Sequence, residues 1–197
     1  MSPKQHRGEV TSDLLLDAAL RVFVDSGEQG LTVSAVVRTS GVSLGSLYHH
    51  FGSLDGLTGA LSHRWLDRLL GELTKALRNA GTARAGIAGA VEAYLAFVQD
   101  HRGPALLLHS PLADRKGTAR GREFRDAQEA RVSEVALWIR QGVDSGELAP
   151  LPLPLIESLV LGPVVAVARR SLSGIDDVDL DEAARLLPEQ IWRSVRA

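Results

Sequence analysis

Residues 31–54 read LTVSAVVRTSGVSLGSLYHHFGSL, and they carry the clearest structural pattern of the sequence. Thr32 and Ser43 each stand directly before an apolar run, which predicts that they cap two short helices. Gly41 lies between the two runs, where a left-handed backbone would reverse the chain. The pattern predicts a helix-turn-helix, and its second helix, over about residues 43–50, would be the one to enter a DNA major groove.

The two predicted helices have an apolar side and a polar side. Val36, Val42 and Leu47 would fill the narrow wedge between them. The outer side of the second helix carries hydroxyl, phenol and imidazole groups, which can donate to phosphates or base edges. These groups belong to Ser43, Ser46, Tyr48, His49 and His50. On this pattern alone, a solvated helix pair in an unrelated bundle is the commoner arrangement.

The rest of the chain repeats apolar residues every three or four positions, and no segment alternates as a half-buried strand does. An all-α fold of about nine helices follows from this periodicity. A flexible polar arm over residues 1–8 would precede a first helix that begins near Thr11 or Ser12 and stops at Gly27. Later helices are predicted over residues 54–79, 83–101, 104–109, 118–145 and 154–171.

Two sequence features concern the C-terminal helices. Asp179, with Glu182 three residues on, has the spacing of a capping box and marks the start of a last helix. Pro163 should kink or restart the helix over residues 154–171, because proline lacks the N–H group that an interior position uses.

The composition of the chain excludes several kinds of functional site. The 197 residues carry 22 Lys and Arg against 24 Asp and Glu, a net charge of −2, so any surface for nucleic acid must be local. The chain has no cysteine, which excludes disulfides, thiolate zinc sites and cysteine nucleophiles. We expect a soluble cytoplasmic protein without a membrane partner, because no signal peptide is present and the apolar stretch over residues 155–168 is too short to span a bilayer.

Residues 31–57 closely resemble the TetR family of regulators, whose motif is approximately LTVxxIAxxAGVSxGxLYxHFxSKxxL. The matching residues are Leu31, Thr32, Val33, Gly41, Val42, Ser43, Gly45, Leu47, Tyr48, His50, Phe51, Ser53 and Leu57. The resemblance implies a three-helix DNA-binding domain at residues 1–54. It implies a helical domain at residues 55–197 that binds a small-molecule effector and forms a homodimer.

The resemblance also implies roles for individual side chains on DNA. These are phosphate contacts from Thr32 and Ser34, base contacts from Leu44, Gly45 and Ser46, and phosphate or neighbouring base contacts from Tyr48 and His50. Family members often carry lysine where this chain has Leu44 and Leu54. Leu44 would either touch a thymine methyl group or be tolerated without a base contact.

The missing lysines make local charge important. Residues 1–54 hold four basic and five acidic residues, a net charge of −1 with histidine neutral. We therefore predict that binding depends on neutral donors and on Lys4 and Arg7 of the arm, with Arg64 or Arg68 added if they approach the DNA backbone. Few cations imply a shallow dependence of affinity on salt.

Several aromatic and histidine side chains are candidates for an effector pocket. Tyr94, Phe97 and His101 share one side of a helix, since they stand at i, i+3 and i+7. The full candidate set is Trp65, Tyr94, Phe97, His101, His109 and Trp138. Each of these residues taken singly is better explained by core packing, whereas for the group the resemblance favours an effector pocket. Neither His101 with His109 nor His49 and His50 with His63 has the spacing of a metal site, so we expect no metal and no cofactor.

A dimer interface is expected at the C-terminal end. Gly162 and Ala166, four residues apart, would let a second helix approach closely. In the family the last two helices form a four-helix bundle across the two-fold axis, and the candidates here are Leu159, Gly162, Ala166, Ile191 and Trp192. Burial within one subunit is the alternative. A dimer would place its recognition helices about 34–36 Å apart, on a near-palindromic operator in double-stranded DNA.

These patterns favour a repressor that an effector releases from its operator. The alternative is an effector-binding or protein-interaction module whose DNA binding has weakened, because two expected lysines are missing. An enzyme is disfavoured, since the chain shows no catalytic constellation and no Gly-rich phosphate loop.

Overall fold

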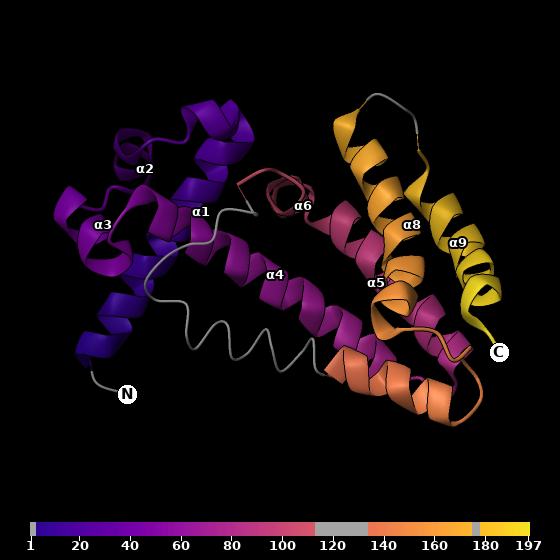
Figure 1. Cartoon of the computed structure of the whole chain (residues 1–197). Coiled ribbons are helices and arrows are strands. Elements are labelled where there is room, and N and C mark those ends of the chain that lie inside the picture. Colours follow the sequence, from indigo (N-terminus) through magenta and orange to yellow (C-terminus); the bar gives the residue numbers. More distant parts are fainter. Residues whose placement is uncertain (1–2, 113–133, 175–177) are drawn as a thin grey trace. The chain divides into compact units, whose positions relative to one another are not determined.

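The computed structural model describes residues 3–112, 134–174 and 178–197, with side chains from Gly8 onward. Every regular element in these ranges is a helix, apart from one isolated bridge between Leu148 and Arg196, so the all-α prediction is confirmed (Figure 1). The helices are α1 (Pro3–Gly30), α2 (Val33–Ser40), α3 (Leu44–Phe51), α4 (Leu54–Arg78), α5 (Ala83–Asp100), α6 (Arg102–Leu108), α8 (Leu153–Ser173) and α9 (Leu180–Val195). Residues 134–144 are also helical.

The described residues fall into two compact units. The first comprises residues 3–66 and 106–112, and the second comprises residues 67–105, 134–174 and 178–197. The division between the units falls inside α4, which therefore contributes to both. The domain boundary predicted at residue 54 lies at the start of the same helix and remains a prediction.

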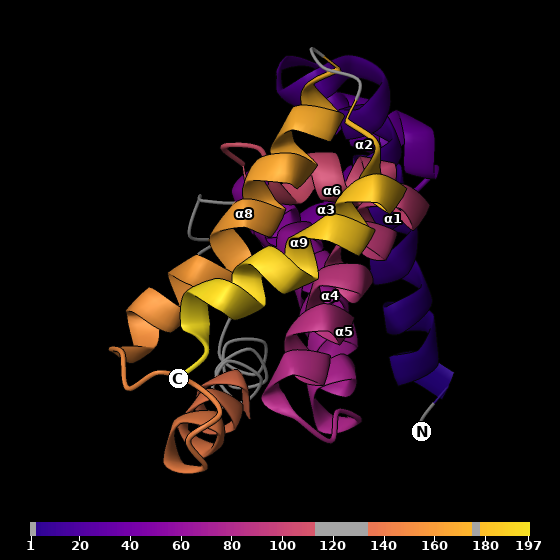
Figure 2. The same cartoon turned by 90° about the vertical axis from the view of Figure 1, so that its right-hand side faces the viewer.

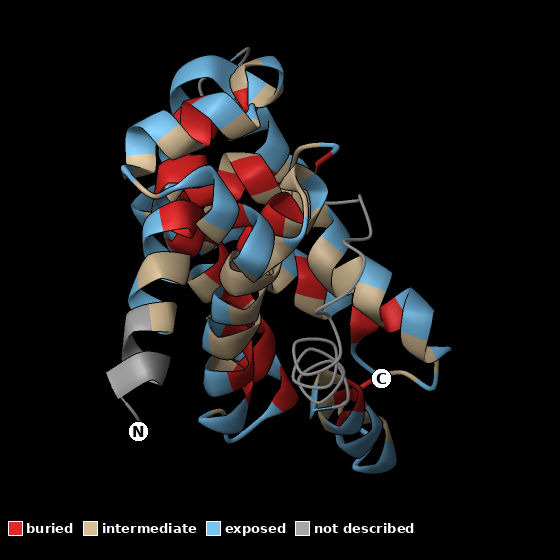
Figure 3. Ribbon diagram, turned by 90° about the vertical axis from the view of Figure 1, so that its left-hand side faces the viewer, coloured by how far each residue is buried: buried red, intermediate tan, exposed pale blue. Residues whose placement is uncertain are grey.

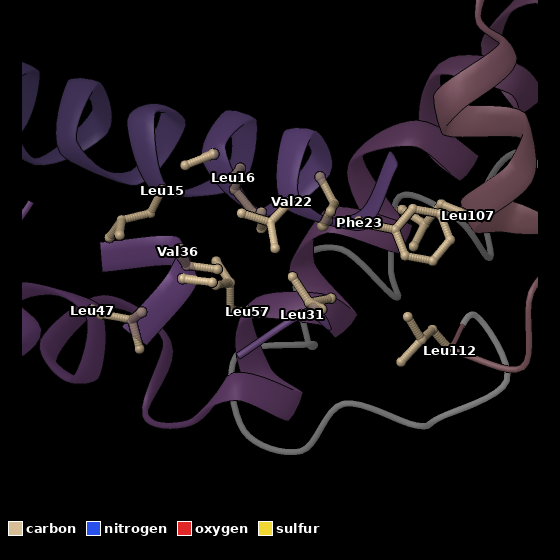
Figure 4. Packing of buried hydrophobic residues seen from close by; sticks show 14 residues of the cluster. Leu15, Leu16, Val22, Phe23, Leu31, Val36, Leu47, Leu57, Leu107 and Leu112 are labelled. Carbon is tan, nitrogen blue, oxygen red and sulfur yellow. The ribbon is translucent and has the colours of Figure 1, made fainter. Parts of the chain in front are cut away.

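The first unit is built around a cluster of buried aliphatic side chains (Figure 4). Leu15 of α1, Val36 of α2 and Leu47 of α3 are each fully buried, and Leu57 of α4 joins them. The outer sides of the same helices are exposed (Figure 3). Because burial of a leucine or valine stabilises a fold by about 1.5–3 kcal/mol, this cluster fixes α2 and α3 against α1.

The second unit has α5, α8 and α9 packed against one another. Figure 2 shows α8 and α9 side by side. Ile87 and Val91 of α5, Ile156 of α8 and Ile191 of α9 are buried, none more than 2% exposed. Because each helix contributes an apolar side, these three helices form the core of the second unit.

The first helix differs from its prediction at its beginning. It begins at Pro3, not near Thr11 or Ser12, so residues 3–8 are helical where we predicted a flexible arm. Proline suits a first helical position, because its missing N–H would have no partner there. At the other end Gly27 has non-helical backbone angles, with φ 66°, so the predicted stop at Gly27 is confirmed as a kink, and a short helical segment follows it to Gly30.

The helix α8 runs through Pro163 from Leu153 to Ser173, so the restart that we allowed there is wrong. Its packing against α5 and α9 offsets the one lost backbone hydrogen bond. The short helix predicted from residue 104 begins at Arg102, with Pro104 in its first turn. Of the helix predicted over residues 118–145, residues 118–133 lie outside the described part of the chain.

Candidate nucleic-acid interface

The turn between α2 and α3 has the predicted caps. Thr32 Oγ1 accepts a hydrogen bond from the Ala35 amide at 3.2 Å, and Ser43 Oγ accepts one from the Ser46 amide at 3.2 Å. Gly41 follows α2 in the left-handed conformation, with φ 69°. These contacts confirm the prediction of a helix-turn-helix, because both helices begin at their capping residues and the glycine reverses the chain.

The outer side of α3 presents two large side chains to solvent. Leu44 is 50% exposed and Tyr48 is 48% exposed. Because they stand four residues apart, they are neighbours on the helix surface. Gly45 beside them is exposed, and no atom lies within 4 Å of the position that a Cβ would take, so the backbone there is open to a close approach. This outward side is apolar and aromatic, and it carries no cation.

Hydroxyl groups flank that side in two hydrogen-bonded pairs. Ser43 Oγ and Ser46 Oγ are 2.9 Å apart, and Thr32 Oγ1 and Ser34 Oγ are 3.2 Å apart. Either oxygen of a pair can donate, so each pair keeps a lone pair or a hydrogen for a further partner. Each pair stands at the N-terminus of its helix, where backbone amides favour an anion such as a phosphate.

The two adjacent histidines of α3 have different surroundings. His49 is exposed, whereas His50 is half-buried. A Cβ added to Gly8 of α1 would lie 3.8 Å from His50 Cε1, and the His50 and Phe51 ring centroids are 6.2 Å apart. His50 therefore contributes to the packing of α3, and His49 is the freer of the two to reach a partner.

The residues predicted to contact DNA lie on α1 and in the helix-turn-helix. Thr32, Ser34, Ser43, Leu44, Gly45, Tyr48 and His49 are exposed, and Ser46 and His50 are half-buried. Lys4 and Arg7 stand on α1, but their side chains lie outside the described ones. The exposure of these side chains does not show that they contact DNA, so their roles remain predictions.

One cation that we considered for DNA binding is engaged within the first unit. The Arg64 guanidinium of α4 lies 2.5 Å from Asp17 Oδ1 and 3.7 Å from Asp13 Oδ1 of α1. Asp13 and Asp17 stand one turn apart on α1, so their carboxylates lie on one side of the helix. This spacing is visible in the sequence and indicates a shared cationic partner. Two carboxylates neutralise the charge of Arg64, so this side chain offers little to a phosphate. Arg68, the other candidate, belongs to the second unit.

The candidate effector residues are divided between the units. Trp65 and His109 belong to the first unit, and Tyr94, Phe97, His101 and Trp138 belong to the second. Tyr94 and Phe97 are buried, and the Phe97 and His101 ring centroids are 5.1 Å apart. Burial raises the pKa of Tyr94 to about 12, against an opposing effect of Arg169. Whether these residues form one pocket remains a prediction.

The candidate dimer residues lie on α8 and α9. Gly162 and Ala166 are exposed, Leu159 and Trp192 are half-buried, and Ile191 is buried within its own unit. Among residues 3–112, 134–174 and 178–197, no three metal-ligating side chains stand together. No helix in those ranges is both long and apolar enough to cross a bilayer.

Residues 15–61 match the family model described as bacterial regulatory proteins of the tetR family. Residues 15–61 therefore belong to the TetR family of DNA-binding segments. The matched residues include α2, α3 and the part of α1 that packs on them, so the resemblance seen in the sequence is confirmed.

Two relatives and one solved structure are similar to the chain. The regulator BetI of Rhizobium meliloti is 33% identical over 102 residues, which are 52% of this chain and 49% of BetI, so the chain spans about half of that relative. The repressor KstR2 of Mycolicibacterium smegmatis is 24% identical over 93% of this chain and 77% of KstR2. A TetR-family structure from Marinobacter aquaeolei VT8 covers 98% of both chains with a TM-score of 0.76 at 20% identity, which shows the shared fold.

Proposed function

We propose that the chain is a DNA-binding transcription regulator, not an enzyme, that acts as a homodimer in the cytoplasm. The observation that carries the proposal is the outer side of α3, where Leu44 and Tyr48 are about half exposed although their helix is anchored by the buried Leu47. Large apolar side chains exposed side by side mark a surface for a partner. On a helix that Ser43 caps and whose first turn also carries the Ser46 hydroxyl, we infer that this partner is a DNA major groove.

The binding mode follows from the residue types. Tyr48 and the hydroxyls of Ser34, Ser43 and Ser46 would donate to phosphates, and Leu44 would contact the base edges. Helix α3, which the structure describes in full, carries no lysine or arginine, so fit to the groove is expected to contribute more to affinity than charge does.

Regulation would come from a small molecule bound in the second unit. Helix α4 contributes to both units, so a change in its position would alter the DNA-binding surface. An effector that binds the free protein more tightly than the DNA-bound protein lowers DNA affinity, and DNA must then weaken effector binding by the same factor. On this basis the protein is a repressor that its effector releases.

Replacement of Tyr48 with alanine tests the DNA-binding surface. We expect the affinity of the full chain for a DNA site selected from random sequences to fall at least about tenfold, because each subunit loses a contact worth about 1 kcal/mol. Fluorescence anisotropy at fixed salt measures the change. The matched control is Leu137→Ala, which truncates a 54% exposed side chain of the helical residues 134–144 and should leave affinity unchanged. If the parent protein binds no DNA even at low salt, the alternative of a module with weakened DNA binding holds instead.

The salt dependence of DNA binding gives a second test. We expect a slope of log affinity against log salt shallower than about −6 for the dimer, whereas a protein with many lysine and arginine contacts reaches about −10. Replacement of Leu44 with lysine should steepen the slope by about 2, one charge from each subunit. A parent slope near −10 would show that cations outside α3 dominate the binding, contrary to the proposal.

A further inference from the structure

A cavity of about 200 Å³ lies inside the second unit, among α4, α5, α8 and the helical residues 134–144. Nine of its eleven lining residues are aliphatic, including Leu73, Ile87 and Val160, so its walls are apolar. The other two lining residues are Trp138 and Glu157. We call it the Glu157 cavity.

Among the described residues that line the cavity, Glu157 is the only ionisable one. It is half-buried, and it forms no hydrogen bond or ion pair with another residue of the described chain. A carboxylate beside apolar walls loses hydration, and that loss is offset when an opposite charge joins it. No basic residue lines the cavity within the described ranges, so a bound molecule would have to supply the positive charge.

Trp138 adds a second group that favours a cation. A Cβ on Gly86 of α5 would lie only 2.3 Å from Trp138 Cζ2, which shows that the indole ring packs directly on the α5 backbone. This contact holds the ring in place before any molecule binds. The face of an indole attracts an ammonium group, most strongly where water is excluded.

We propose that the Glu157 cavity binds a small organic ammonium ion with an apolar body of one aromatic ring or a short alkyl chain. Size supports this class, because a cavity of roughly 150 Å³ lined by aliphatic groups already holds benzene. Charge supports it too, because the Glu157 carboxylate would repel an anion, and no lysine or arginine among the described lining residues would offset that repulsion. The ion is also the effector of the regulator, and this second statement rests on the proposed function.

Calorimetric titration of the full chain with three probes of similar shape tests the site. We expect 2-phenylethylammonium to bind at least about tenfold more tightly than neutral 2-phenylethanol, and 3-phenylpropanoate to show no binding. Replacement of Glu157 with glutamine should weaken the ammonium ion about tenfold and change the alcohol less than about twofold. The matched control is Glu72→Gln, at an exposed glutamate of α4 outside the lining, which should change neither.

The possible results distinguish failure of the ammonium site from failure of the proposed regulator function. Equal binding of all three probes, or binding of none, overturns the ammonium site, and this comparison uses the parent protein and needs no variant to fold. DNA anisotropy with saturating 2-phenylethylammonium then tests the effector role, for which we expect DNA affinity to fall at least about fivefold. DNA binding that the ammonium ion leaves unchanged overturns that role. Failure of the parent to bind DNA overturns the regulator, while the calorimetric result for the cavity still stands.

Discussion

Replacement of Leu47 with alanine should lower the free energy of unfolding of the first unit by about 3 kcal/mol. Leu47 is fully buried in the cluster that joins α3 to α1, α2 and α4. Truncation of a buried leucine removes its transfer free energy and leaves a cavity, which together cost about 2–5 kcal/mol. Because α3 is only eight residues long and cannot persist alone, this loss would also abolish DNA binding.

Tryptophan fluorescence can follow this unit separately. Trp65 packs against the cluster, and the other two tryptophans, Trp138 and Trp192, belong to the second unit. Denaturant unfolding in a background with phenylalanine at positions 138 and 192 therefore reports on the first unit alone. Leu44→Ala is the control, since it makes the same change on the exposed side of α3 and should cost less than about 0.5 kcal/mol. Equal losses in the two variants would contradict the role given to Leu47.

The elements that were predicted correctly are formed by interactions between residues that are close together in the sequence. Thr32 and Ser43 cap helices because a hydroxyl can bond the amide three residues on, and Gly41 turns the chain because it tolerates a positive φ. Asp179 likewise accepts hydrogen bonds from the Asp181 and Glu182 amides. Such interactions span only a few residues, so the local sequence determines them.

The features that were missed depend on distant residues or on the energy of packing. The ion pair of Arg64 with Asp17 joins residues far apart in the chain, and although Asp13 and Asp17 share one side of α1, no local pattern indicates that their partner comes from α4. Glu157 has no partner among the described residues, and it becomes a candidate for ligand binding only because apolar side chains of four helices line the cavity beside it. Pro163 shows the opposite case, because a strong local signal for a break yields to the packing of α8.

Replacement of Tyr94 with phenylalanine should make the second unit more resistant to alkaline unfolding. Tyr94 is 7% exposed, and burial raises its pKa from the ordinary value of 10.0 to about 12. Between these two values the native state keeps the phenol proton while the unfolded state loses it, so stability falls as pH rises. A difference of two pKa units corresponds to about 2.7 kcal/mol in full, of which about 2.3 kcal/mol is lost by pH 12, and the loss is negligible below about pH 9.

Chemical unfolding at pH 9 and pH 12 measures this effect as a difference between parent and variant. The subtraction removes the contributions of the other groups that titrate at high pH, since both proteins contain them. Tyr48→Phe is the control, because it removes the hydroxyl of the other tyrosine, which is 48% exposed, and should leave the alkaline loss of the parent intact. In that same control protein Tyr94 is the single tyrosine, so tyrosinate absorbance should reach half its final value near pH 12. A midpoint near pH 10 would mean that water reaches the phenol, and the close packing of α5 in the core would then have to open in solution.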